Sequence, residues 1–262
     1  RMPFISPDDT RWIQVVLACP HDMYQLPGYS VLEAKMLQGS PLAWYSTDKS
    51  GNAVLIPLIE RVIHNNDSIE KDLVSPYGYP GIVHDRSISK EQYSNSINEF
   101  HAEAAQKGYV SSFIRLHPVY NTCQISNQPG ITQHIHGFTV SINLNLSIAD
   151  IRKTYSLNHR RNLTHLLQKG YQVSINEWGK LHDFVRIYTQ TMERKKAKCR
   201  YFFNEEYLIG LKEILKDNLM LIMVQDDHGQ QTAGGLFSIV SGLAQFHLGG
   251  TANDFMKHSP SK

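Results

Sequence analysis

The sequence has few cysteines and no long apolar run, and each shortage excludes a class of protein. Its 262 residues include three cysteines, Cys19, Cys123 and Cys199, an odd number without Cys-x-x-Cys spacing. We therefore expect neither a disulfide framework nor a metal site. No segment approaches the roughly 18 apolar residues that a transmembrane helix needs, and the first residues lack the apolar core of a signal peptide. These absences predict a soluble, cytoplasmic protein without a transmembrane segment.

A strong net charge is also missing from the chain as a whole, but not from its parts. The net charge is +2, yet residues 152–200 hold 12 lysines and arginines and three acidic residues, which gives +9. The remainder holds 14 basic and 21 acidic residues, which gives −7. This asymmetry indicates an anionic partner such as a nucleotide, a phosphorylated lipid headgroup or RNA. A basic helical surface that only faces solvent is the alternative, since the interleaved aromatics of a defined RNA-binding module are absent.

The first half of the chain has the pattern of an α/β domain. We expect a short helix at residues 12–18, strands at 42–47 and 52–63 joined by a turn, and a strand at 71–74 that runs into a loop. Ser89 and Gln92 form a capping box for a helix that ends at Gly108. A strand at residues 109–118 follows. We assign residues 1–125 to an N-terminal domain.

The second half reads as another α/β series after a turn-rich connector. We expect a strand at residues 138–146, a helix opened by Ser147 and Asp150 that reaches Gly170, a strand at 171–178, a helix at 181–196, a helix capped by Asn204, and strands at 219–227, 233–240 and 243–252. We assign residues 126–262 to a C-terminal domain.

Five stretches, in order over nearly the whole chain, carry a resemblance to a known superfamily. They are SPYGYPG (75–81), FIRLHP (113–118), SLNHRRNLTHLLQKGY (156–171), YTQTMERKKAKCRYFFNEEYL (188–208) and AGGLFSIVSGLAQFHLGGTANDFMKHSPSK (233–262). Together with the order of the elements, these stretches resemble the FemAB-like branch of the GNAT superfamily, in which two GNAT-type domains follow one another.

The resemblance implies the α/β (α+β) class, with two tandem GNAT-like domains whose mixed sheets are flanked by helices. It also implies an enzyme that moves an acyl group onto an amine. In FemAB proper the donor is an aminoacyl-tRNA and the acceptor is a peptidoglycan precursor, while other relatives are N-acetyltransferases that use acetyl-CoA. The chain stops where the donor-loop helix of the second domain would begin, so we expect that domain to be incomplete, with an exposed sheet edge.

The loop at residues 75–81 is the first candidate for substrate binding. A loop between a strand and a helix can offer backbone N–H groups to a phosphate, but the pyrophosphate signature of the superfamily, roughly Gln/Arg-x-x-Gly-x-Gly/Ala, is absent. Tyr77, Gly78 and Tyr79 instead offer two rings and two hydroxyls to an acceptor sugar or base. A rigid turn with buried tyrosines is the alternative.

Arg115 and His117 are further candidates for substrate binding. The predicted strand at residues 109–118 places both on one face, near its exit. An arginine can grip a phosphate or carboxylate with two hydrogen bonds. In the alternative interpretation, Arg115 pairs with an acid and His117 is a structural polar residue.

The basic region supplies candidates through the resemblance. It makes His159, Arg160, Arg161 and Asn162 contacts for an anionic substrate, whereas a contribution to solubility alone is the alternative. Arg194 matches a substrate-binding position that the family keeps facing its cleft. Tyr201 matches another such position, and we take it as a catalytic candidate.

The last stretch adds His247, which can relay a proton and is the second catalytic candidate, and Gly249 and Gly250, which permit close approach by a substrate. A structural histidine is the alternative. No Ser/His/Asp or Cys/His arrangement has a recognisable spacing, so direct attack by the acceptor amine in an interdomain cleft is favoured over a covalent enzyme intermediate.

These patterns leave three functions open. The first is transfer of an aminoacyl or acetyl group onto an amine of a cell-envelope precursor or sugar, with an anionic small-molecule or lipid-linked acceptor. The donor is then aminoacyl-tRNA or acetyl-CoA, with no permanently bound cofactor. The second is plain acetyl-CoA-dependent N-acetylation. The third is a non-catalytic GNAT-like module that binds nucleotide-sugar or RNA.

Overall fold

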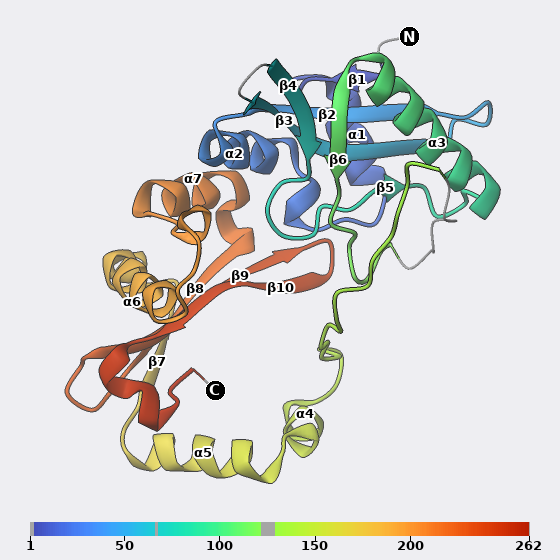
Figure 1. Cartoon of the computed structure of the whole chain (residues 1–262). Helices are drawn as coiled ribbons and strands as arrows, with labels where there is room; N and C mark the ends of the chain where they lie inside the picture. Colours follow the sequence, from blue (N-terminus) through green and yellow to red (C-terminus); the bar gives the residue numbers. More distant parts are fainter. Residues whose placement is uncertain (1–2, 66–67, 122–128, 262) are drawn as a thin grey trace. The chain divides into compact units, whose positions relative to one another are not determined.

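The computed structural model describes residues 3–65, 68–121 and 129–261, and it divides the chain into two compact units (Figure 1). Unit 1 comprises Arg1–His136 with Val240–Leu243, and unit 2 comprises Gly137–Ile239 with Ala244–Lys262. The predicted domain boundary after residue 125 lies outside the described residues, as does Cys123. Each unit has its own sheet and its own helices. The predicted α/β class is therefore confirmed.

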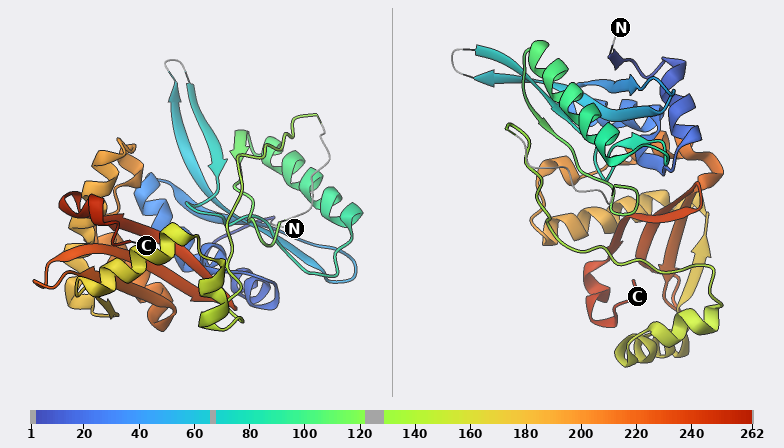
Figure 2. Two further views of the ribbon diagram at one scale, coloured as in Figure 1. Left: turned by 90° about the horizontal axis from the view of Figure 1, so that it is seen from below. Right: turned by 90° about the vertical axis from the view of Figure 1, so that its right-hand side faces the viewer.

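The sheet of unit 1 has the strand order β1-β2-β3-β4-β6, with β5 paired to β3. All pairs are antiparallel except β4 with β6, which run parallel. Figure 2 shows β3 and β4 as a long hairpin. The strands are β1 (Phe4–Ile5), β2 (Ser40–Thr47), β3 (Ala53–Asn65), β4 (Ser68–Val74), β5 (Val83–His84) and β6 (Tyr109–Phe113), and the α-helices are α1 (Thr10–Ala18), α2 (Pro27–Leu37) and α3 (Lys90–Gln106).

Successive residues of β3 face opposite sides of this sheet and build a core on each side. Leu55 packs with Trp12 of α1, and Ile59 packs with Ala34 of α2. Ile56, one residue along from Leu55, packs instead in the core that contains the buried side chains of α3. Helices therefore pack on both faces of the sheet, while β6 and the end of the β3–β4 hairpin are exposed.

Capping residues explain where the unit 1 helices begin. The Asp9 side chain accepts a hydrogen bond from the Arg11 N–H at the start of α1, and Ser89 forms the predicted capping box with Gln92 at the start of α3. Helix α2, which the sequence patterns do not predict, begins with Pro27, a residue suited to the first helical turn.

The sheet of unit 2 has the strand order β10-β9-β8-β7. Its strands are β7 (Gln172–Ile175), β8 (Leu219–Gln225), β9 (Gln231–Val240) and β10 (Leu243–Thr251). Its helices are α4 (Ile148–Thr154), α5 (Leu157–Gln168), α6 (Leu181–Arg194) and α7 (Glu205–Leu215), and the short 3-10 helix η5 (Asn253–His258) follows β10. The predicted strands at residues 219–252 and the cap at Asn204 are confirmed, since its side chain accepts from the Tyr207 N–H.

Three predicted elements of secondary structure were wrong. Residues 138–146 form no strand, and their apolar side chains are exposed, because no described segment pairs with them. The single helix predicted up to Gly170 is two helices, because Ser156 caps α5 by accepting from the His159 N–H. Strand β6 ends at Phe113, four residues before His117. Among the described residues, no helix is long and apolar enough to cross a bilayer.

Candidate functional site

The loop at residues 75–81 is held in place by polar groups from two distant segments. The Tyr29 hydroxyl donates to the Tyr77 carbonyl (3.0 Å), and the Gln25 side-chain amide donates to the Pro80 carbonyl (2.8 Å). On the other side, the Gly81 N–H donates to the Arg115 carbonyl (2.9 Å). The loop is therefore a rigid part of unit 1.

The backbone N–H groups of this loop are mostly committed to the protein itself. The Tyr77 N–H donates to the buried carboxylate of Glu33 (3.2 Å), and the next residue after the loop, Ile82, donates its N–H to the Asn121 side chain (2.9 Å). Gly78 has φ +87°, and the ring of Tyr24 occupies the position where a Cβ would stand. A carboxylate beside these donors disfavours a phosphate, so the loop does not form an anion cradle of the pyrophosphate type.

Tyr79 is the part of the loop most open to a ligand. Its side chain is 42% exposed, while its ring edge contacts Tyr24 with centroids 6.2 Å apart. Tyr77 is half-buried and Gly78 is buried. The loop can therefore present the Tyr79 ring and hydroxyl on a fixed backbone.

Arg115 and His117 do not share the face of a strand, which corrects their predicted placement. The Arg115 guanidinium lies over the Phe113 ring, 5.1 Å from its centroid. His117 is buried, with Nε2 2.9 Å from a carboxylate oxygen of Asp22, which is also buried. Its Nδ1 accepts from the Val119 N–H (3.1 Å), so the ring hydrogen lies on Nε2 and points to the carboxylate. His117 therefore holds the turn at residues 117–120 together through Nδ1 and ties that turn to Asp22 through Nε2.

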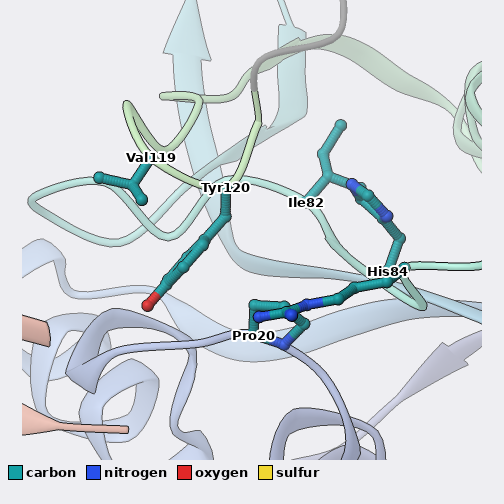
Figure 3. A pocket seen from close by; sticks show the side chains of 6 residues that line it. Pro20, Ile82, His84, Val119 and Tyr120 are labelled. Atoms are coloured by element: carbon teal, nitrogen blue, oxygen red, sulfur yellow. The ribbon is translucent and has the colours of Figure 1, made fainter. Parts of the chain in front are cut away.

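Unit 1 also has a pocket of about 320 Å³ beside this turn (Figure 3). Its lining residues come from three segments and are Pro20, Ile82, His84, Arg86, Val119 and Tyr120. None of them was a candidate from the sequence.

In unit 2, helix α5 carries the residues predicted to contact an anionic substrate, which are His159, Arg160, Arg161 and Asn162. Arg160 and Arg161 are exposed, and His159 is half-buried with its ring 4.5 Å from that of Tyr155. The Asn162 side-chain amide donates to the Ser259 carbonyl (3.2 Å), which ties α5 to the end of η5.

The end of α6 contributes a second group of cations in unit 2. The Arg194 guanidinium donates to the Asn253 side chain at the start of η5, and to the Thr251 carbonyl (3.2 Å) at the end of β10. The cluster that begins with Arg194 is exposed, and its other members are Lys195, Lys196, Lys198 and Arg200. Because η5 contacts both α5 and α6, it joins the two groups of cations.

The two catalytic candidates lie in different settings. Burial lowers the pKa of His247 to about 3, so its imidazole is neutral at neutral pH and cannot act as a general acid there. Tyr201 is half-buried, its ring lies under the Arg200 guanidinium (4.8 Å), and its hydroxyl accepts from that group (2.8 Å).

Gly249 and Gly250 have a packing explanation in β10. A Cβ on Gly250 would lie 2.7 Å from the Thr191 hydroxyl oxygen and 3.0 Å from the Ile187 carbonyl, both on α6. A Cβ on Gly249 would meet the Phe246 ring. Gly250 lets the helix lie close to the strand, and Gly249 leaves room for the Phe246 ring of its own strand, so packing accounts for both without a ligand.

No protein-family model and no curated protein matches this sequence. Among solved structures, the crystal structure of FemX superposes with a TM-score of 0.67 and covers 99% of this chain and 83% of its own, at 13% sequence identity. The chain has the fold of FemX. The structure of L-PGS from Bacillus licheniformis is also similar, with a TM-score of 0.50 and 12% identity, over 97% of this chain and 73% of its own. The fold that the resemblance implies is thereby confirmed.

Within this FemX-like fold, hydrogen bonds bring together some of the predicted substrate-binding residues in each unit, but not the two catalytic candidates. In unit 1, the loop at residues 75–81 lies beside Arg115 and the turn at His117, and in unit 2, η5 joins Asn162 to Arg194. The substrate contacts themselves, and a cleft shared by the two units, stay predictions. The sequence patterns missed Asp22 and Asn121, which hold the unit 1 group together. A capping pair of Asp22 and Gln25 was the one local signal available for them.

Proposed function

We propose that this protein is an acyltransferase that moves an aminoacyl group onto an amine of a cell-envelope precursor. The observation that carries the proposal is the fold of FemX over 99% of the chain. The ordered sequence motifs that resemble the FemAB-like branch support it independently of the fold. The acceptor in this proposal is an anionic or lipid-linked precursor, as in the FemAB enzymes that the motifs resemble.

We propose aminoacyl-tRNA, rather than acetyl-CoA, as the donor. A CoA donor needs free backbone N–H groups for its pyrophosphate after β4, whereas Tyr77 and Gly81 donate theirs to Glu33 and Arg115. A tRNA needs cations spread over a surface, and unit 2 carries such cations on α5 and at the end of α6. The net charge of +9 over residues 152–200 is consistent with this donor.

The reaction in this proposal is a direct transfer without an enzyme-bound acyl group. The lone pair of the acceptor amine attacks the ester carbonyl of the aminoacyl-tRNA, an amide bond forms, and the ester C–O bond breaks. The proton that the amine loses ends on the ribose hydroxyl of the departing tRNA, directly or through a base. Tyr201 is the candidate for that base, since its hydroxyl lies beside the exposed cations of unit 2 and accepts from the Arg200 guanidinium. Binding both reactants in one orientation supplies most of the acceleration.

The test is transfer of a labelled amino acid by the full chain. Charged tRNAs are mixed with cell-wall precursors that carry a free amine, and label in the precursor is measured against acetyl-CoA as an alternative donor. We expect transfer from tRNA. The variant Arg160→Glu/Arg161→Glu should raise KM for charged tRNA at least about tenfold. It should also lower the number of counterions released on tRNA binding, measured from the salt dependence of the affinity, by about one to two.

A matched control keeps the change in charge the same. Lys49→Glu/Lys90→Glu reverses two exposed cations of unit 1 and should leave KM for tRNA close to the wild-type value. Transfer from acetyl-CoA alone, or an equal rise in KM in both double variants, would contradict the proposed donor. The absence of transfer from every donor and acceptor would contradict the proposed activity.

A further inference from the structure

The pocket in unit 1 has the size and the mixed lining of a small-molecule site. Its volume of about 320 Å³ lies at the lower end of the range for such sites, which is roughly 300–1,000 Å³. Figure 3 shows Tyr120 and Val119 on one side, with Ile82 and His84 across from them. Because all the lining residues belong to unit 1, the pocket does not depend on how the two units are arranged.

Buried hydrogen bonds fix the walls of this pocket to one another. The Asn121 side chain bonds the backbone of Ile82 in both directions and also accepts from the His117 N–H (3.0 Å), which locks two of the three wall segments together. The Tyr120 hydroxyl donates to the His21 carbonyl (3.2 Å) in the third segment, next to Pro20. The pocket is thus formed before any ligand arrives, which lowers the entropic cost of binding.

The charged group at this pocket is a cation without a protein anion. Arg86 is exposed, and among residues 3–65, 68–121 and 129–261 no carboxylate forms an ion pair with it. The neighbouring acid, Asp85, accepts instead from the N–H and the hydroxyl of Ser87 (2.8 and 2.7 Å). Burial and Asp22 raise the pKa of Tyr120 while Arg86 opposes that rise, so the positive charge of Arg86 acts on the pocket wall.

The remaining lining restricts what kind of anion fits. Pro20, Ile82 and Val119 are apolar, and the Tyr120 ring, stacked on His117 with centroids 4.4 Å apart, is a flat rigid wall. Ile82 is already buried in the core, so Pro20, Val119 and the Tyr120 ring are the apolar surfaces open to a ligand. An inorganic ion would leave them in contact with water, whereas an anion with an apolar body would cover them. A planar carboxylate also matches the two parallel N–H groups of a guanidinium.

We propose that this pocket binds a small organic carboxylate, whose carboxylate pairs with Arg86 and whose apolar body lies against Val119 and the Tyr120 ring. The site goes beyond the proposed transfer reaction and is independent of it, since it is built from unit 1 alone and uses none of the cations of unit 2. A failure of this proposal therefore leaves the acyltransferase proposal standing, and the reverse holds as well.

The test is titration calorimetry of the full chain with benzoate as the probe and benzyl alcohol as its neutral counterpart. We expect benzoate to bind and benzyl alcohol to bind at least about tenfold more weakly, which is the effect of losing one charge-assisted pair. Arg86→Gln should weaken benzoate binding by a similar factor. Lys90→Gln, which removes an exposed cation elsewhere in unit 1, should leave it unchanged.

A second variant tests the position of the ligand. Val119→Asp places a carboxylate on the pocket wall at a side chain that is 49% exposed, so the fold should tolerate it, while benzoate binding should be lost. Benzoate affinity that is equal in wild type, Arg86→Gln and Val119→Asp would overturn the proposal, as would the absence of binding at millimolar benzoate. Tighter binding of phenyl phosphate than of benzoate would overturn the assignment to a carboxylate.

Discussion

Loss of the Asn121 side chain should destabilise unit 1 strongly. Its Oδ1 accepts from the N–H groups of Ile82 (2.9 Å) and His117 (3.0 Å), and its Nδ2 donates to the Ile82 carbonyl (2.7 Å). Asn121→Ala leaves two donors and one acceptor unpaired in a buried position. Each such group costs about 1–3 kcal/mol, and water that enters the vacated space recovers part of this, so we expect a loss of about 3–4 kcal/mol in the free energy of unfolding.

Urea unfolding measured by tryptophan fluorescence can isolate this effect. Trp12 and Trp44 are fully buried in unit 1, whereas Trp178 belongs to unit 2, so a Trp178→Phe background makes the signal specific to unit 1. With an m value of about 2 kcal/mol per molar urea, the midpoint should fall by about 1.5–2 M. The control Asn162→Ala removes a single hydrogen bond in unit 2 and should leave this transition in place.

Asn121→Asp separates the two roles of the amide. The aspartate keeps an acceptor for the N–H groups of Ile82 and His117, but it loses the donor and turns an oxygen toward the Ile82 carbonyl. Its stability should therefore lie between those of wild type and Asn121→Ala. A midpoint shift for Asn121→Ala below about 0.5 M would refute the reasoning. Wild-type stability of Asn121→Asp would show that the hydrogen bond from Nδ2 to the Ile82 carbonyl contributes nothing to stability.

Three further predictions concern single groups. Gly250→Ala should lower the free energy of unfolding by about 1–3 kcal/mol, because its Cβ would lie 2.7–3.2 Å from atoms of α6, while Gly137→Ala, with no atom within 4 Å, should be neutral in the same thermal melt. Burial raises the pKa of the Cys19 thiol to about 11, so only about 0.1% of it is thiolate near pH 8. In a variant that lacks Cys123, iodoacetamide should therefore modify the exposed Cys199 far faster than Cys19. Equal rates of modification would contradict this. Burial lowers the pKa of His247 to about 3, so the unfolded chain, with a histidine pKa of about 6.5, takes up the proton first as the pH falls. As the pH falls from about 6.5 to about 3, the free energy of unfolding should decrease by up to about 1.4 kcal/mol per pH unit. His247→Gln should reduce this pH dependence in urea titrations, and an unchanged pH dependence would show that the buried imidazole is already charged.

Local signals predicted much of this fold because they act within one turn of helix or one hairpin. The capping box at Ser89 and the cap at Asn204 each satisfy backbone donors three residues away, so the sequence determines them without knowledge of the rest of the chain. The turn after β2 forms in the same way, since the Asp48 side chain accepts from the Ser50 and Asn52 N–H groups. These helix starts and strand ends were correct for that reason.

The wrong elements are those whose outcome depends on a distant partner or on competing signals. Alternating apolar residues at 138–146 favour a strand only where another strand supplies hydrogen bonds, and none of the described strands does. Ser156 lies inside a pattern that looks continuously helical, but its hydroxyl caps α5 more favourably than it fits a helix interior. Helix α2 was missed because Ser30 and Glu33 are buried on it, which hides its apolar face from periodicity.

Sequence patterns identified the loop of the candidate site in unit 1, but not the side chains that hold this loop in place. Two tyrosines, two prolines and two glycines at residues 75–81 indicate a restricted backbone, and the structure has one. The side chains that restrict it, Gln25, Glu33 and Asn121, come from positions about 40 to 55 residues away in sequence. No local pattern identifies such partners, because they are selected by the tertiary fold.

The way this loop is anchored decides how it can take part in recognition. The carbonyls of the loop accept from Gln25 and Tyr29, and the Tyr77 N–H donates to the Glu33 carboxylate. The backbone therefore has few hydrogen-bond donors left for a phosphate. Whatever the loop binds must then be contacted by a side chain, and Tyr79 is the one most exposed. A ring and a hydroxyl on a fixed backbone suit a neutral sugar or peptide surface. For the proposed reaction, unit 1 is therefore the candidate for the acceptor site, and the exposed cations of unit 2 are the candidates for contacts with an anionic donor.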